Sequence, residues 1–173
     1  EVLHEAYGER LFIIQFDAHA DLRDDYLGMR FSHATVMKHI SQIVGMDNTA
    51  VIGIRSGTRD EWRLLRKHPH FFSGVPSLHV SDFVSFAREN LSESKIYLTV
   101  DLDVFDPGVM PGTGTPEPGG IDFKTFMESL QSLDGLECVG ADIVELAPDY
   151  DRSGISSALA ATVLRELLLI LGT

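Results

Sequence analysis

Apolar and polar positions alternate in blocks along the chain. Short apolar runs are separated by longer segments in which apolar residues recur every three or four positions. The first pattern is typical of a buried strand, and the second is typical of a helix that buries one face. The runs expected to form strands are 11–16, 49–54, 95–100 and 136–144, and the segments expected to form helices are 32–44, 58–68, 81–90, 122–133 and 153–171. Strands and helices that alternate in this way predict an α/β domain with a largely parallel sheet.

Prolines and glycines gather between residues 109 and 120, where we expect a loop. No internal repeat, linker or low-complexity tract interrupts the alternation. We therefore expect residues 1–173 to form a single domain. Its expected architecture has three layers, with a mostly parallel sheet between two layers of helices.

Three of the predicted strands run directly into a carboxylate: Asp17, Asp101 or Glu145. In open α/β sheets the ligand binds outside the carboxyl ends of the strands. The three carboxylates should therefore lie along one rim of the sheet. A single aspartate after a strand is usually a turn or a helix cap, but three such endings are difficult to explain in that way.

Two of these strand ends carry further candidate ligands at steps of two residues: Asp17, His19 and Asp21, then Asp101 and Asp103. Steps of two place side chains on the same side of an extended backbone. Four carboxylates cannot converge without a cation, because like charges raise one another's pKa or push the chain apart. A set of carboxylates with one imidazole suits manganese better than a metal that prefers thiolates. We expect two metal ions, which together could hold a bridging water as hydroxide.

Charge and composition exclude some classes of protein. The net charge of −12, from 26 acidic and 14 basic residues, argues against nucleic acid as a partner. It suits a metal ion or a cationic substrate, although an ordinary acidic surface would explain it equally well. No apolar run approaches the roughly 18 residues of a membrane span, and residues 1–10 lack a secretion signal. The single cysteine, Cys138, excludes an internal disulfide and favours a cytoplasmic location.

The chain resembles the ureohydrolase family of arginases and agmatinases. The segments that carry the resemblance are FDAHADLR (16–23), SHAT (32–35), DLDVFDP (101–107), PGTGTPEPGG (111–120) and DIVELAP (142–148). Their order and spacing follow the family over essentially the whole chain. The two aspartate motifs together with the PGTGTP loop are highly specific, and they imply an arginase-like fold.

The resemblance also implies a role for each metal-site residue. Asp17 and Asp101 match the ligands that bridge both metal ions. His19 and Asp103 match ligands of one ion, and Asp21 matches a ligand of the other. The family's counterpart of Asp21 also bonds the bridging hydroxide and passes a proton to the departing amine.

Two further residues match groups that act on the substrate. His33 matches a histidine that shuttles protons or contacts the substrate without binding metal. Glu145 matches the carboxylate that pairs with the planar guanidinium. The implied reaction is hydrolysis of a guanidino group to urea and an amine. The bridging hydroxide would attack while Glu145 holds the carbon in line, and Asp21 or His33 would protonate the leaving nitrogen.

The resemblance favours agmatine as the substrate, with putrescine as the amine product. Arginases usually follow their aspartate-histidine motif with an asparagine for the substrate's α-carboxylate, whereas Leu22 and Arg23 follow Asp21 here, as in many prokaryotic agmatinases. Asp149 or Asp151 could line an acidic mouth for the free ammonium of agmatine. Relatives that act on arginine, guanidinobutyrate, guanidinopropionate or formimidoylglutamate share the metal motifs and stay open as alternatives.

One family segment is missing from the sequence. Family members carry an earlier Gly-Gly-Asp/Glu-His-Ser segment whose histidine binds the metal held by Asp21, and residues 1–15 contain no match. We therefore expect an N-terminally truncated chain that corresponds to the C-terminal two-thirds of the family domain, with five protein ligands in place of six.

Two other classes of protein fit parts of the pattern. One is a catalytically impaired, metal-binding relative that keeps the fold. The other is an amidohydrolase similar to histone deacetylases, which would hold a single zinc and would not need Asp21 or Asp103. The family resemblance further implies a homo-oligomer, a trimer or a hexamer.

Overall fold

A five-stranded sheet forms the centre of the computed structural model. The structure describes residues 1–68, 70–73 and 76–172, and for residues 71–73 and 76–81 it describes the backbone alone. The strands are β1 (Leu11–Phe16), β2 (Thr49–Ile54), β3 (Phe71–Ser73), β4 (Lys95–Asp101) and β5 (Glu137–Val144). They lie in the order β3-β2-β1-β4-β5, and every neighbouring pair is parallel. The predicted parallel sheet is confirmed.

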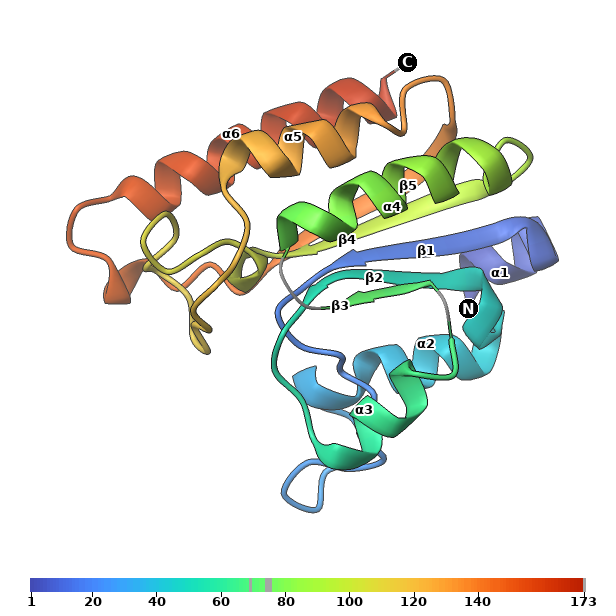
Figure 1. The fold of residues 1–173 in the computed structure, drawn as a ribbon, viewed down its shortest axis with the longest axis horizontal. Coiled ribbons are helices and arrows are strands. Elements are labelled where there is room, and N and C mark those ends of the chain that lie inside the picture. Colours follow the sequence, from blue (N-terminus) through green and yellow to red (C-terminus); the bar gives the residue numbers. More distant parts are fainter. Residues whose placement is uncertain (69, 74–75, 173) are drawn as a thin grey trace.

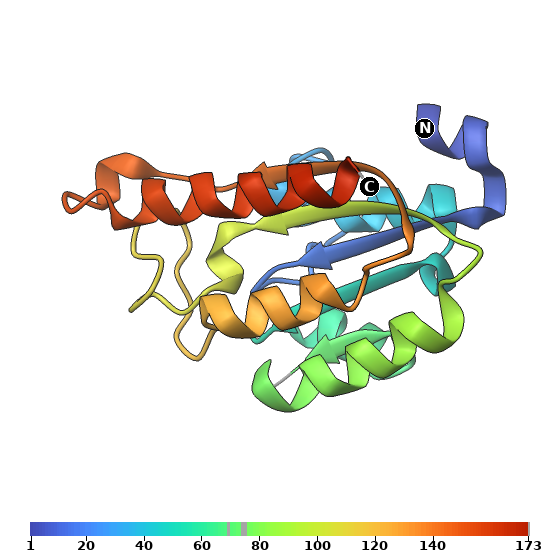
Figure 2. The same ribbon diagram turned by 90° about the horizontal axis from the view of Figure 1, so that it is seen from above.

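Helices cover both faces of this sheet. They are α1 (Val2–Tyr7), α2 (Val36–Val44), α3 (Arg59–Leu65), α4 (Pro76–Asn90), α5 (Phe123–Gln131) and α6 (Ile155–Leu171). Figures 1 and 2 show α4, α5 and α6 on one face, and α1, α2 and α3 on the other. This arrangement confirms the three-layer α/β/α prediction. Within the described ranges, no helix combines the length and the hydropathy that crossing a membrane requires.

The central strand β1 is buried on both faces and supplies side chains to two separate cores. Phe12, Ile14 and Phe16 pack in the core beneath α4, α5 and α6. Leu11 and Ile13 point the opposite way, into the core shared with α1, α2 and α3. Side chains on a strand alternate between its faces, so a continuous apolar run is what burial on both sides requires.

Two short elements were not expected from the sequence. Helix α1 has only six residues, none of them fully buried, which is too short for a periodic pattern to stand out. Strand β3 has three residues, which is too short for an alternating pattern to stand out. Elements this short leave little trace in the order of apolar residues.

Two helices begin elsewhere than predicted. The segment expected to be helical from residue 32 starts with a 3-10 turn at His33–Thr35, and α2 begins only at Val36. The hydroxyl of Thr35 accepts a hydrogen bond from the Ser32 backbone N–H at 2.9 Å, which favours this tight turn. Helix α4 begins at Pro76, five residues before Ser81, and proline is well suited to the first turn of a helix. The side chain of Ser81 lies outside the described part of the chain.

Candidate metal centre

Neighbouring parallel strands deliver the candidate ligands to one end of the sheet, the left-hand end in Figure 1. Phe16 of β1 lies opposite Val100 of β4, so Asp17 and Asp101 come next on adjacent strands. Asp101 in turn pairs with Val144 of β5, which Glu145 follows. The predicted rim of three carboxylates is therefore present.

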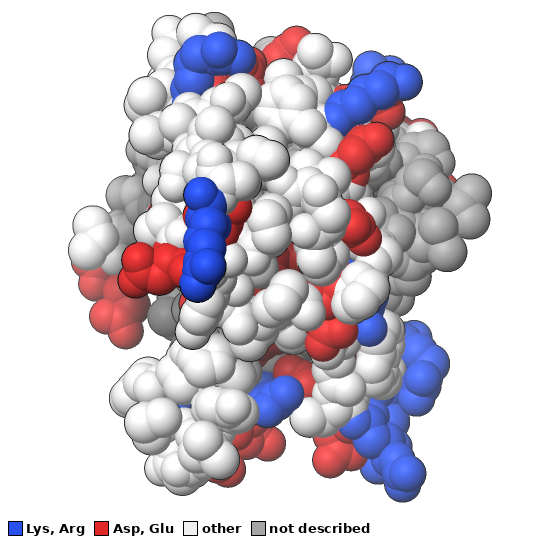
Figure 3. Space-filling model, turned by 90° about the vertical axis from the view of Figure 1, so that its left-hand side faces the viewer, with Lys and Arg blue, Asp and Glu red and all other residues white. Residues whose placement is uncertain are grey.

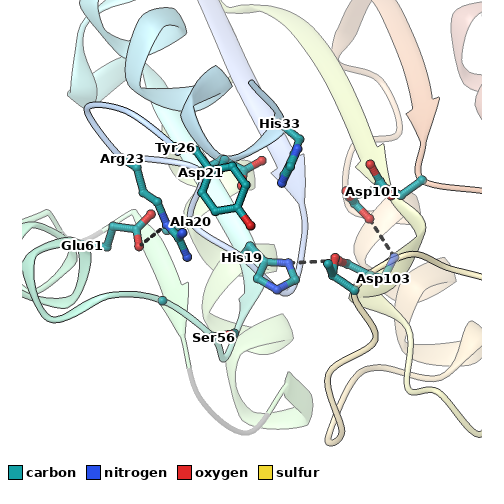
Figure 4. A pocket seen from close by; sticks show the side chains of 14 residues that line it. His19, Ala20, Asp21, Arg23, Tyr26, His33, Ser56, Glu61, Asp101 and Asp103 are labelled. Atoms are coloured by element: carbon teal, nitrogen blue, oxygen red, sulfur yellow. Dashed lines mark hydrogen bonds and ion pairs between the residues drawn. The ribbon is translucent and has the colours of Figure 1, made fainter. Parts of the chain in front are cut away.

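Asp17, His19 and Asp103 form a close triad. Each offers one ligand atom, and the three atoms lie within 4.8 Å of one another. The Nδ1 atom of His19 is 2.9 Å from Oδ2 of Asp103 and 3.4 Å from Oδ1 of Asp17. Both carboxylates are only 1% exposed, and Figure 4 shows the imidazole directed at Asp103. Two buried carboxylates and one imidazole nitrogen could hold a divalent cation.

Backbone N–H groups hold these carboxylates in place. The N–H of His19 donates to Oδ1 of Asp17 at 2.6 Å, and the N–H of Ala18 donates to Oδ1 of Asp103 at 3.1 Å. The N–H of Asp103 donates to Oδ1 of Asp101 at 2.8 Å. The bond from Ala18 to Asp103 joins the two motifs, and each of the other two bonds holds a carboxylate of its own motif. Orientation by surrounding groups is what a metal site needs in addition to its ligands.

Asp21, His33 and Glu145 line the same cavity as His19 and Asp101. Asp21 and Glu145 have φ angles of 53° and 63°, in the left-handed region that side-chain-bearing residues rarely adopt. Such strained conformations cluster at functional sites. All seven residues singled out from the sequence thus come together, while their individual roles stay predictions.

Burial and repulsion raise the pKa of three of the carboxylates. The pKa is raised to about 6 for Asp17, to about 8 for Asp21 and to about 10 for Asp101. Burial is the main cause for each residue, and the charges of neighbouring carboxylates add to it. A carboxyl group with so high a pKa holds its proton unless a positive charge stabilises the ionised form.

The His19–Asp103 pair behaves in the opposite way. Burial alone would lower the pKa of His19, but hydrogen bonds to Asp103 and Asp17 raise it to about 10. Burial would likewise raise the pKa of Asp103, and the hydrogen bond and charge of His19 lower it instead. The imidazolium proton thus neutralises part of the carboxylate cluster. A divalent cation could replace that proton, so the donor set fits a metal ion.

The structure adds residues that the sequence did not single out. Gln15 is buried in β1, and its amide Nε2 donates to the carboxylate of Asp17. Arg55 follows β2, and Tyr26, Glu61 and Thr115 line the cavity. Two of these had a signal in the sequence: Gln15 is a polar residue inside an apolar run, and Arg55 is a charge directly after one.

The end of the molecule that carries the site is acidic. Figure 3 views this end and shows acidic side chains along the middle of the face. Asp149 and Asp151 do not line the cavity. The carboxylate of Asp151 instead accepts from the N–H groups of Ser153 and Ser156 at 2.8 and 2.7 Å, which stabilises the turn that leads into α6.

Comparisons with known proteins bear on the family and the fold of the chain. The model of the arginase family matches residues 1–170. An agmatinase from Halalkalibacterium halodurans is 35% identical over 171 residues, which cover 98% of this chain and 58% of that protein. An agmatinase from Bacillus subtilis is 37% identical over 166 residues, which cover 92% of this chain and 54% of that protein. The solved structure of proclavaminate amidino hydrolase from Streptomyces clavuligerus superposes with a TM-score of 0.83 at 32% identity, over 98% of this chain and 57% of that one. The chain thus spans somewhat more than half the length of these relatives.

Proposed function

Because this chain belongs to the arginase family, we propose that the protein hydrolyses a guanidino group to urea and an amine. The observation that carries the proposal is the shared cavity, which acidic residues and His19 from the ends of β1 and β4 line together with Glu145 from the end of β5. The first group can hold metal ions, and the carboxylate of Glu145 can hold a guanidinium cation.

Five residues would hold two manganese ions. We assign Asp17 and Asp101 as shared ligands, His19 and Asp103 to one ion, and Asp21 to the other. When bound, the ions supply a nucleophile derived from water at neutral pH and offset the repulsion among the carboxylates. Manganese suits this set because oxygen ligands outnumber nitrogen ligands and no thiolate is among them.

Glu145 would orient the substrate. A guanidinium is a planar cation, and a carboxylate can accept two parallel hydrogen bonds from it. Gly114 leaves room for this side chain, since a Cβ at position 114 would stand 3.1 Å from Oε2 of Glu145. The pairing fixes the guanidino carbon relative to the metal ligands at the ends of β1 and β4, which reduces the entropic cost of attack.

Asp21 and His33 would handle the proton that the leaving group needs. Addition of water oxygen to the guanidino carbon forms a C–O bond, and cleavage of a C–N bond then releases urea. The departing nitrogen leaves as a neutral amine only if it gains a proton. Asp21 and His33 both line the cavity, so each is placed to supply that proton.

Agmatine is the substrate that we propose for the complete protein, with putrescine, a polyamine precursor, as its product. The agmatinases from H. halodurans and B. subtilis, at 35% and 37% identity, support this choice. The acidic face around the cavity favours a substrate with a second positive charge at its far end. Arginine, guanidinobutyrate and formimidoylglutamate are the alternatives to be tested beside it.

The test measures urea release and metal content together. The full-length protein that contains these residues is loaded with Mn²⁺. Urea release is then measured with agmatine, arginine and guanidinobutyrate as substrates. We expect urea from agmatine and about two metal ions per chain. Asp101→Asn should lose metal and activity together, whereas Asp134→Asn, an exposed aspartate on the loop after α5, should keep both. Two bound ions without urea from any substrate would instead identify a catalytically impaired relative.

A further inference from the structure

Arg55 directs its guanidinium group into the backbone beside the candidate metal centre. Its side chain donates six hydrogen bonds, and every acceptor is a backbone carbonyl oxygen. Nη2 lies 2.7 Å from the carbonyl of Asp103, and Nη2 and Nε lie 2.8 and 3.1 Å from the carbonyl of Glu117. The remaining acceptors are Gly53 at 3.1 Å, Val104 at 3.2 Å and Phe105 at 3.3 Å.

These carbonyls belong to three segments that are distant in sequence. Gly53 lies in β2, residues 103–105 form the turn after β4, and Glu117 lies in the glycine-rich loop. Only a planar group with several N–H donors in fixed directions can bond all three at once. Arg55 therefore links the turn that carries Asp103 to the glycine-rich loop.

Both held segments contact the imidazole of His19. The carboxylate of Asp103 is 2.9 Å from Nδ1, and that of Glu117 is 3.9 Å from Nε2. The hydroxyl of Thr115, in the same loop as Glu117, donates to Oδ2 of Asp103 at 3.1 Å. Movement of either segment would change the direction of the Asp103 carboxylate relative to His19.

We propose that Arg55 is a positioning residue of the metal centre, which raises its affinity for Mn²⁺ by fixing the backbone of Asp103 and Glu117. Arg55 is not a ligand, since a guanidinium carries only donors. Its effect passes through the orientation of Asp103, and groups that orient metal ligands typically change metal affinity about 10–100-fold. This inference rests on the proposed function, because it presumes that Asp103 binds metal.

Other contacts keep the two segments folded when the guanidinium is replaced. The N–H of Ile121 donates to Val104 at 3.1 Å, and the N–H of Asp106 donates to Ile121 at 3.0 Å. The carboxylate of Asp106 accepts from the N–H groups of Gly119 and Gly120 at 2.9 and 3.3 Å. These bonds join the base of the loop to the turn without Arg55. We therefore expect Arg55→Lys, which keeps the charge but loses the planar fork, to fold.

The experiment compares Arg55→Lys and Arg55→Ala with the unaltered protein and with Arg165→Lys, an exposed arginine on α6 paired with Glu166. Free Mn²⁺ is followed by electron paramagnetic resonance during titration, and thermal unfolding in EDTA reports the folded fraction. We expect Arg55→Lys to unfold within a few degrees of the unaltered protein and to bind Mn²⁺ about 10–100-fold more weakly. Arg165→Lys should match the unaltered protein in both measurements.

The outcomes separate this inference from the proposed function. If Arg55→Lys is folded and binds Mn²⁺ as tightly as the unaltered protein, Arg55 does not position the centre, and the proposed function stands. If the unaltered protein binds no Mn²⁺, the proposed metal centre fails and this inference fails with it. Should Arg55→Ala not fold, Arg55→Lys alone decides.

Discussion

At the scale of single residues, ionisation of the metal-site side chains lowers the stability of the metal-free folded state as the pH rises. Asp21 and Asp101 have pKa values raised to about 8 and about 10, against about 3.9 for an aspartate in an unfolded chain. The raised value of His19, about 10, acts in the same direction above its ordinary value of about 6.5. The folded state therefore binds more protons than the unfolded state, and its stability falls as the pH rises through this range.

The metal-free protein should accordingly lose stability between pH 6 and pH 9, and Mn²⁺ should restore it. Metal displaces the protons, so the gain in melting temperature on replacing EDTA with Mn²⁺ is expected to be larger at pH 8.5 than at pH 6. Thermal unfolding at the two pH values measures this difference. Asp101→Asn should weaken the pH dependence in EDTA, while the exposed Asp134→Asn should not. A metal-free melting temperature that rises over this range would contradict the expected direction of the pH dependence.

His33 offers a separate test of the residue roles. It is exposed at the cavity, and its ring lies edge-on to Tyr26, with centroids 5.0 Å apart. We expect His33→Ala to keep its bound metal and to lower the rate of urea formation about 10²–10⁴-fold, the range typical of a lost acid–base group. His39→Ala is the matched control, because Nε2 of His39 contacts the carbonyl of Arg30 at 2.8 Å, outside the cavity. Loss of metal from His33→Ala would show that His33 is a ligand.

At the scale of elements, the sequence predicts most of what positions the site. The apolar runs that become β1, β2, β4 and β5 are buried in a parallel sheet, and such burial is what makes a strand visible as a continuous apolar segment. The acidic residues after three of these strands could also be predicted from the sequence, because a charged residue directly after an apolar run marks the end of the strand.

The remaining features have no comparable signal. Helix α1 and strand β3 are too short for periodicity, and the start of α4 depends on a proline that sequence rules allow equally in a loop. Five of the six carbonyl contacts of Arg55 are to residues about 50 to 60 positions away, which come close only in the folded chain. The left-handed conformations of Asp21 and Glu145 are likewise imposed by tertiary structure.

The packing of α5 against the sheet provides a prediction at this scale. Phe126 is fully buried, and its ring centroid lies 5.2 Å from that of Phe16 and 5.3 Å from that of Phe105. These two phenylalanines belong to the segments 16–23 and 101–107, which carry the metal-site aspartates. We expect Phe126→Ala to lower the free energy of unfolding by about 3–5 kcal/mol, as large-to-small core substitutions do. Phe31→Ala is the control, since Phe31 is 76% exposed and should change stability by less than about 0.5 kcal/mol. Urea denaturation of both variants gives the difference, and equal midpoints would contradict the core assignment.

At the scale of the whole molecule, one side of the sheet carries exposed apolar surface. Within the described ranges β5 pairs only with β4, so its outer edge presents free backbone groups. Beside it, an apolar groove runs between β5 and α6, and Leu164 and Leu168 on its rim are 50% and 60% exposed. An unpaired edge next to exposed leucines is a template for association.

The 173-residue chain on its own should therefore self-associate as its concentration rises. Replacing Leu164 and Leu168 together by Lys removes apolar area and adds repulsion between copies, so the apparent mass at a given concentration should fall. Leu27→Lys is the control, because Leu27 is 82% exposed on a turn remote from this groove and should leave the mass unchanged. Sedimentation velocity over a range of concentrations measures the apparent mass of the unaltered chain, the double variant and Leu27→Lys. A monomer at every concentration would contradict the prediction, and association that persists in the double variant would place the contact on another surface.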